Sequence, residues 1–599
     1  MTERNLFSAI FLFASGIVLY FGLPFTPVIQ ASILISILAA AVAIRYANRS
    51  IPIALTAVFL FGFFYADVRT GLVKTNLLNH SGWDREIVGV VERIDYTAAN
   101  QRLFIRTADD LVLRISVPRG IECAEGADVS LRAKTIDAPG PANVFSRFDY
   151  RRWAYFNGIS GTGFAYDAKC VGGKKTLRSS IHFMTDNRLA DSLVLGYKGA
   201  IPRDEFDIIR ASGVAHVFSI SGFHLALVGG WLFFLFYAAA RLITPFSRRW
   251  PARNLAVPFV LAGLLFYLLL SGSGIPTIRS FIMATAGFMA LILGCSVLTL
   301  RNAALVFALM LLMQPFWAVS AGFQLSFAAI FGLLYFFNKH KLPKNKILRV
   351  IFVILMTDLV ATAWTAPFAM YHFNLFPLYT SLGNLVLLPI FSLGIMPIIM
   401  FGTVTSLFGW RGPFYISDML YDFVLGFSGW IQGLPFAQIS IPEMPGVSLY
   451  LMFAGLFLFL MNHRRVALAL IAIASIWIFA RPVPVLRTTW DNEIVGFMQD
   501  GAMYFNVNWS ERHRFIVPRG NQFRANCRRG LCVYKTENWT AVSVQRFVPL
   551  RRNLNQLCDY DFIISRLRLE LPDCQEKVLP GGVRIYADGR VEKFRARRY

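Results

Sequence analysis

The sequence predicts a polytopic α-helical membrane protein with two soluble domains, of which the first is rich in β-strands. Three observations lead to this fold class. The chain of 599 residues is 56% hydrophobic and 15% aromatic, with a mean hydropathy of +0.52, far above the values of soluble proteins. Apolar runs close to the length that a bilayer requires recur along most of it. Two polar stretches, residues 67–173 and 481–599, interrupt this pattern.

The chain is also strongly basic. Its formal net charge is +24, from 59 Lys and Arg against 35 Asp and Glu. Cytoplasmic loops of membrane proteins collect Lys and Arg, so part of this excess reflects topology. The remainder lies outside the apolar runs, where a polyanionic partner is one physical reason for it.

Six cysteines fall in the two polar stretches, whereas Cys295 lies in an apolar run. The six are Cys123, Cys170, Cys527, Cys532, Cys558 and Cys574. An even set confined to soluble regions predicts disulfides and an oxidising side of the membrane. Zinc is the competing interpretation, but only His513 lies near the tail cysteines and no histidine lies near the first pair. We predict the pair Cys123–Cys170, and the four tail cysteines leave three pairings open.

Residues 1–66 predict three transmembrane helices. The apolar spans cover residues 6–23, 28–45 and 51–66. Because the first span continues directly into two more, we expect a retained helix and not a cleaved signal peptide. Arg45 and Arg49 place the second loop in the cytoplasm, so the N-terminus is expected inside and residue 67 outside.

Residues 67–173 predict a small β-barrel or sandwich. Short segments with alternating apolar residues are separated by turns. These segments are residues 86–94, 102–107, 111–116 and 128–135. The domain closes on a mixture of basic and aromatic side chains: Arg147, Tyr150, Arg151, Arg152 and Trp153. Such a mixture suits single-stranded nucleic acid, and next to a bilayer it equally suits a membrane-interface belt.

Residues 174–212 predict polar linker helices, and residues 213–480 predict a transmembrane domain. Its expected spans begin with a helix that follows residue 213 and continue with residues 254–271, 277–296, 302–318, 319–337, 348–366, 379–404, 446–461 and 466–480. The less apolar residues 412–432 either cross the membrane or lie at its interface. Basic loops mark the cytoplasmic side, which places the tail, residues 481–599, outside with the first soluble domain.

A cluster of polar residues lies at the entrance of an apolar run, in residues 213–226. On a continuous helix His216 and Ser219 would share one face. Ser221 and His224 would be neighbours. Because unsatisfied polar groups are costly in hydrocarbon, we expect this cluster to face protein, water or substrate. Hydrogen bonding between packed helices is the simpler alternative.

Four ordered sequence elements make the membrane part of the chain recognisable. They are His216, Ser221, Gly222 and His224; Ser271, Gly272, Pro276, Arg279 and Phe281; Gly322 to Phe327; and Pro367, Tyr371, Phe373, Asn384 and Pro389. In this order and spacing they resemble the ComEC family of competence proteins, inner-membrane channels for DNA uptake. The resemblance runs from about residue 30 to residue 480. It implies that residues 67–173 adopt an OB-fold-like domain.

The tail departs from the family. Many relatives end in a metallo-β-lactamase-like domain with a His-x-His-x-Asp-His motif, whereas residues 481–599 contain one histidine, His513. One imidazole is too few for a two-metal site. We therefore expect a small α/β domain that is a degenerate remnant of that fold, with no metal, no cofactor and no enzymatic activity. Within it, residues 561–564 are typical of a buried strand.

Further residues are candidates for the substrate path. Arg279 follows a Gly- and Ser-rich break and can pair with phosphate. Gln324 and Ser326 would both face a cavity only if their helix were irregular. Asp358 is the acidic residue most embedded in a span, and Asn384 precedes an apolar run. For each of these residues a role in helix packing is the competing interpretation.

The resemblance implies a channel that translocates single-stranded DNA into the cytoplasm during natural transformation. A transporter of another anionic substrate and an intramembrane serine/histidine hydrolase are the alternatives. The expected partners are single-stranded DNA, membrane lipids, a periplasmic DNA-binding protein and a separate nuclease. A cytoplasmic ATP-driven motor is expected too, because the sequence has no phosphate-binding P-loop. The sequence leaves open whether the protein forms a homo-oligomer. The expected location is the bacterial inner membrane.

Overall fold

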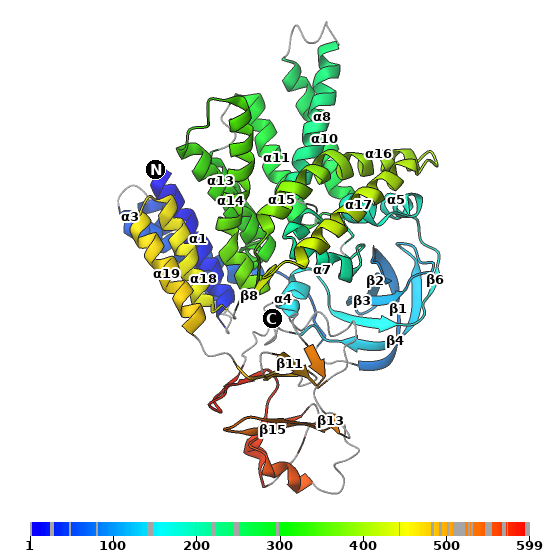
Figure 1. Cartoon of the computed structure of the whole chain (residues 1–599), viewed down its shortest axis with the longest axis vertical. Helices are drawn as coiled ribbons and strands as arrows, with labels where there is room; N and C mark the ends of the chain where they lie inside the picture. Colours follow the sequence, from blue (N-terminus) through cyan, green and yellow to red (C-terminus); the bar gives the residue numbers. More distant parts are fainter. Residues whose placement is uncertain are drawn as a thin grey trace.

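The computed structural model describes most of the chain (Figure 1). The described residues are 3–23, 29–46, 50–78, 82–140, 148–197, 199–218, 220, 222–242, 251–294, 299–441, 444–480, 484–489, 494–499, 502–506, 522–524, 527–528, 531–544, 554–565, 569, 571 and 573–593. Among them, eight helices are long and apolar enough to cross a membrane, which makes the chain a multi-pass membrane protein.

Three helices open the chain, as the apolar spans predict. They are α1 (Glu3–Gly22), α2 (Ile29–Tyr46) and α3 (Ile51–Gly71). Helix α1 packs on α3 through Phe13 and Phe61, whose rings lie 5.7 Å apart. It also stacks Phe11 on Phe457 of α18 (Gly446–Leu460), with ring centroids 4.1 Å apart. The N-terminal helices therefore contact helices from the far end of the membrane domain.

A β-barrel follows the third helix. Its strands are β1 (Gly82–Tyr96), β2 (Asn100–Thr107), β3 (Val112–Pro118), β4 (Asp128–Asp137), β5 (Gly161–Ala165) and β6 (Lys169–Val171). Strands β1-β2-β3-β5-β4 form a ring, since β1 pairs with both β2 and β4. Alternate residues of β3 are buried, as in a barrel whose interior is filled by side chains. The four predicted strands correspond to β1–β4.

Three short helices connect the barrel to the membrane domain: α5 (Leu177–Thr185), α6 (Arg188–Leu193) and α7 (Arg203–Ala211). A further short helix, α4 (Tyr150–Phe156), lies between β4 and β5. Helix α6 is almost entirely buried, although its sequence is polar. Its Asp191 carboxylate lies 2.7 Å from Nδ1 of His182, and burial raises the pKa of Asp191 above its usual range. The Tyr96 ring stacks on His182 at 4.0 Å, and burial raises the pKa of Tyr96 to about 12.

The membrane domain has more breaks than hydropathy predicts. Its elements are η1 (Val214–Phe218), α8 (Gly222–Leu242), α10 (Ala252–Leu270), α11 (Ile275–Leu293), α12 (Leu300–Met313), η2 (Pro315–Val319), α13 (Ala321–Lys339), α14 (Lys346–Phe373), α15 (Thr380–Pro389), η3 (Ile390–Ile395), α16 (Met396–Ser406), α17 (Gly412–Gln432), α18 and α19 (Arg464–Ala480). The predicted span 302–318 ends at Met313 because Pro315 cannot continue it. The span 379–404 contains a π-helical turn, η3, after Pro389.

Residues 412–432 form α17, which packs against α7 and α16. One hydrophobic core joins the barrel, the connecting helices and helices α8, α10, α16 and α17. Two short strands, β7 (Leu375–Pro377) and β8 (Gln438–Ser440), pair across the loops that follow α14 and α17.

The described part of the tail consists of two sheets. Their strands are β9 (Leu486–Thr488), β10 (Val495–Gln499), β11 (Ala502–Phe505), β12 (Gln522–Arg524), β13 (Cys527–Arg528), β14 (Leu531–Lys535), β15 (Thr540–Val544), β16 (Phe562–Ser565), β17 (Val578–Leu579), β18 (Val583–Ile585) and β19 (Val591–Lys593). The predicted buried strand is β16, in which Ile563 and Ile564 are fully buried. The predicted α/β arrangement differs, because the helices described in the tail are only short 3₁₀ turns.

All six cysteines of the polar stretches form disulfides: Cys123–Cys170, Cys527–Cys532 and Cys558–Cys574. The predicted pair Cys123–Cys170 is confirmed, and it closes a loop of 47 residues beside β6. The barrel and the tail lie beyond the same end of the helices, opposite the N-terminus (Figure 1).

We expect these disulfides to be present in cells. In a Cys295→Ser background, a membrane-impermeant maleimide should label the six cysteines only after reduction, because a disulfide has no free thiol. Removing the Cys123–Cys170 pair should destabilise the barrel by about 2–4 kcal/mol. Labelling of all six positions without reduction would contradict both the pairing and the oxidising compartment.

Candidate functional site

The polar motif of residues 213–226 is not one helix, so the predicted helical face is wrong. A 3₁₀ helix, η1, ends at Phe218, and α8 begins at Gly222. Gly213 starts this arrangement with a φ of +79°, which a residue with a side chain rarely adopts. His216 and His224 therefore belong to two separate elements. The candidates Ser219 and Ser221 lie outside the described residues.

Helix α15 holds η1 in place by direct backbone contact. A Cβ on Gly383 of α15 would lie 2.2 Å from the carbonyl oxygen of Ser212, and a Cβ on Gly213 would lie 2.3 Å from Oγ1 of Thr380. The Ser212 hydroxyl also shares a hydrogen bond of 3.0 Å with Ser428 of α17. The position of the motif thus depends on glycines at both sides of this contact.

Three polar side chains from different elements meet beside η1. Asn384 of α15 donates a hydrogen bond of 2.5 Å from Nδ2 to Oδ1 of Asp358 on α14. The carboxylate of Asp358 also interacts electrostatically with His216. His216 is exposed, with Nδ1 3.2 Å from the carbonyl oxygen of Gly213. We call His216, Asp358 and Asn384 the polar triad; its carboxylate and accessible imidazole lie among membrane helices.

His224 and Arg279 belong to the first two motif elements and are both buried. His224 of α8 is fully buried, hydrogen-bonds to the backbone of Val217 and interacts electrostatically with His216. Arg279 of α11 is 5% exposed, and its Nη1 donates to the carbonyl oxygen of Gly322 in the first turn of α13. Its Nε has no hydrogen-bond partner among the described residues. The guanidinium thus links two of the motif elements and keeps one unused donor.

Gly222 and Pro276 lie at the starts of neighbouring helices. Gly222 is the first residue of α8, and a Cβ there would lie 3.4 Å from the Ser280 hydroxyl oxygen. Pro276 is in the first turn of α11, where backbone N–H groups have no partner within the helix, so the missing N–H of proline costs no helical hydrogen bond. Gly222 therefore permits the close approach of α8 and α11, and Pro276 marks the start of α11.

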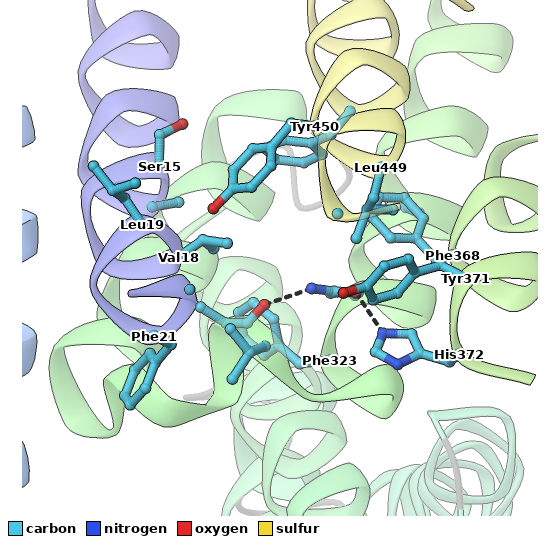
Figure 2. A pocket seen from close by; sticks show the side chains of 18 of the residues that line it. Ser15, Val18, Leu19, Phe21, Phe323, Phe368, Tyr371, His372, Leu449 and Tyr450 are labelled. Carbon is cyan, nitrogen blue, oxygen red and sulfur yellow. Dashed lines mark hydrogen bonds between the residues drawn. The ribbon is translucent and has the colours of Figure 1, made fainter. Parts of the chain in front are cut away.

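Gln324 and Ser326 do not share a face, since α13 is a regular helix. Nε2 of Gln324 donates a hydrogen bond of 2.8 Å to the carbonyl oxygen of Ala318, and its Oε1 accepts one of 2.7 Å from Nε2 of His372. Both residues line a cavity of about 740 Å³, which Ser326 does not line. Figure 2 shows His372 at the wall of this cavity. His372 was not predicted from the sequence, although its neighbour Tyr371 belongs to a motif element.

The basic and aromatic residues that close the barrel are mostly engaged within the protein. Tyr150 and Trp153 pack on each other at 5.5 Å and on the barrel. Arg152 donates 3.3 Å to the carbonyl oxygen of Phe21, at the end of α1. Arg151 is partly buried in the same helix, and Arg147 lies outside the described residues. These contacts hold Tyr150, Trp153 and Arg152 against the barrel and α1, and binding of single-stranded nucleic acid by this segment stays a prediction.

Comparison with known proteins agrees with the motif elements. Residues 193–466 match the model of the Competence protein family. ComE operon protein 3 of Bacillus subtilis (strain 168) is 22% identical over 427 residues, which cover 68% of this chain and 52% of that protein. Recombination protein 2 of Haemophilus influenzae is 24% identical over 332 residues, which cover 51% of this chain and 40% of that protein. Competence protein ComA of Neisseria gonorrhoeae is 28% identical over 313 residues, which cover 47% of this chain and 42% of that protein.

The matched region contains the polar triad, His224 and Arg279. This confirms the resemblance that the four motif elements indicate. The chain spans about half, or less, of the length of these curated relatives. No solved structure matches it.

Proposed function

We propose that this chain, whose residues 193–466 match the Competence protein family, is the inner-membrane channel through which single-stranded DNA enters the cytoplasm during natural transformation. The observation that carries the proposal is the polar triad, since an accessible histidine and a carboxylate among membrane helices are costly unless they line a substrate path. Buried Arg279 belongs to the next motif element, on α11.

The proposed path carries one strand and not a duplex. A duplex is about 20 Å wide, more than a bundle filled with side chains leaves open, and one strand has fewer phosphates to desolvate. Neutral histidines can hydrogen-bond phosphate oxygens without holding them as tightly as fixed cations would. Weak binding at several sites lets a substrate leave as well as enter. A base can lie against Phe223, which is 37% exposed, at about 1–3 kcal/mol per stacked base.

We place both soluble domains in the periplasm. Both domains lie beyond the same end of the helices, and both contain disulfides. The basic loops at residues 243–253 and 339–349 mark the cytoplasmic side and support the same orientation. The ring order β1-β2-β3-β5-β4 supports an OB-fold-like barrel. In this proposal a periplasmic DNA-binding protein delivers the DNA to the channel, and a cytoplasmic ATP-driven motor pulls the strand through it.

The tail is proposed to have no nuclease activity of its own. A two-metal hydrolase needs several His and carboxylate ligands, and residues 481–599 contain a single histidine, which lies outside the described residues. The purified full chain should therefore degrade neither strand of a DNA duplex in magnesium, manganese or zinc, and a separate nuclease should remove the second strand. Metal-dependent cleavage that persists through purification and disappears when the tail is deleted would contradict this assignment.

Uptake of labelled DNA by a deletion strain tests the channel directly. The mutant should accumulate DNA that is protected from added nuclease in the periplasm and should yield no transformants, because only the inner-membrane step is lost. The parent gene should restore transfer of label to the cytoplasm. Normal transfer in the deletion strain would contradict the proposal. If the deletion strain instead loses uptake of another anion, the transporter alternative is favoured. If it loses hydrolysis of a membrane substrate, the intramembrane hydrolase is favoured.

A further inference from the structure

A cavity separate from the polar triad runs along the inner side of α1. Its volume is about 740 Å³, and it is enclosed by α1, α13, α14 and α18 together with residues of the tail. Phe7 and Phe21 of α1 both line it, and the 14 residues between them correspond to about 21 Å of helix. None of His216, His224, Arg279, Asp358 and Asn384 lines it. It is thus a second site within the same fold.

The wall of this cavity is apolar and aromatic over most of its depth. Figure 2 shows Phe323, Phe368 and Leu449 on one side and Val18 and Leu19 of α1 on the other. The polar groups at depth include the hydrogen-bonded pair Gln324 and His372 and the tyrosines of α14 and α18. Such a wall suits hydrocarbon, because it offers little to an ion.

Positive charge is gathered at one end of the cavity. Arg152 of α4, which donates to the Phe21 carbonyl at the end of α1, lines it together with Arg487 of β9 and Arg584 of β18. Asp149 is the carboxylate among the described lining residues, and it lies 3.4 Å from Nη2 of Arg152. Glu592, outside the lining, lies 3.7 Å from Nη1 of Arg584, so the three guanidinium groups at this end still exceed the two carboxylates by one charge. Two of the arginines come from the tail, which places the tail at the entrance of the cavity.

We propose that this cavity binds an anionic phospholipid, with an acyl chain between α1 and α18 and the phosphate at Arg152, Arg487 and Arg584. An acyl chain of one leaflet spans about 15 Å, half of the hydrocarbon thickness, and fits within the length of the cavity. Guanidinium groups pair well with a phosphate oxyanion. Bound in this way, the lipid would join the tail to the membrane domain.

A DNA strand fits the cavity less well than a lipid. Each nucleotide would carry a phosphate into a region whose described lining has no Lys or Arg apart from the three at the entrance. Burying unpaired phosphates costs far more than base stacking returns. A phospholipid leaves its one phosphodiester at the arginines and buries only hydrocarbon.

Photo-crosslinking on the full-length protein tests this site. The protein is reconstituted in phosphatidylcholine vesicles with a trace of phosphatidylglycerol or of phosphatidylcholine, each carrying the same photoactivatable acyl chain. Phosphatidylglycerol should crosslink to peptides of α1 and α18 about tenfold more than phosphatidylcholine, since a charge-assisted hydrogen bond gives that ratio or more. Arg152→Gln should remove most of this preference, whereas Arg132→Gln, on the exposed barrel surface, should not.

Ser15→Trp fills the cavity from α1 and should reduce crosslinking of both lipids about tenfold; Ser8→Trp, on the same helix outside the lining, should not. If Ser15→Trp fails to fold, Ala328→Phe fills the same space from α13. Equal crosslinking of the two lipids, or no effect of filling, would overturn the proposal. So would displacement of the lipid by a single-stranded oligonucleotide that crosslinks to the same peptides, since the cavity would then belong to the DNA path.

Discussion

Arg279→Ala should lower transformation about a hundredfold while DNA still reaches the periplasm and the protein is present at its normal level. The guanidinium is almost fully buried, bonds the Gly322 carbonyl and retains an unused donor for a phosphate. Losing a charge-assisted hydrogen bond of about 2–3 kcal/mol corresponds to a decrease of roughly a hundredfold, measured as transformation frequency. His224→Ala should have the same effect, since His224 lies beside His216.

Matched substitutions separate a role in the path from a general loss of stability. Arg301→Ala removes an exposed arginine from α12, and His340→Ala removes an exposed histidine at the end of α13. Both should transform like the parent. If Arg279→Ala and His224→Ala are well folded and also transform like the parent, the path lies elsewhere and these residues serve packing.

Gly383→Ala should lower transformation by at least tenfold through the position of the motif. The new Cβ would lie 2.2 Å from the Ser212 carbonyl oxygen, so α15 and η1 must move apart. Overpacking of this kind costs about 1–3 kcal/mol, although alanine by itself favours a helix by about 1 kcal/mol over glycine. The measurements are transformation frequency and the thermal stability of the purified protein.

Gly230→Ala is the control for this substitution. Gly230 lies in the middle of α8, and a Cβ there would meet nothing within 4 Å. It should leave transformation unchanged and stability equal or higher. A Gly383→Ala protein that behaves like Gly230→Ala would show that the contact between α15 and η1 does not position the motif.

Hydropathy predicts where the membrane helices lie but not where they break. The three N-terminal spans and most later spans correspond to helices because twenty apolar residues have few alternatives to a helix in a bilayer. The sequence does not predict the break between η1 and α8, because the spacing of three between polar residues in 213–226 also fits a continuous helix. It depends on the contact of Gly213 with α15, which lies more than 150 residues away along the chain.

The candidate site was predicted residue by residue but not as an arrangement. Asp358 and Asn384 were singled out separately, and the sequence gives no indication that they bond to each other beside His216. Phe218 lies within the same motif, and its ring is buried against Phe391 and Tyr421, which the spacing of the motif does not indicate. Tertiary packing, which local spacing does not encode, decides both cases.

Site-specific crosslinking to DNA during uptake tests the central claim most directly. A photoreactive phenylalanine analogue replaces either Phe223, at the start of α8 beside the triad, or Phe234, which is 76% exposed farther along the same helix. If single-stranded DNA passes the polar triad, the incoming strand should crosslink at position 223 and not at position 234. Equal crosslinking at both positions, or crosslinking at neither while transformation proceeds, would contradict the proposed path.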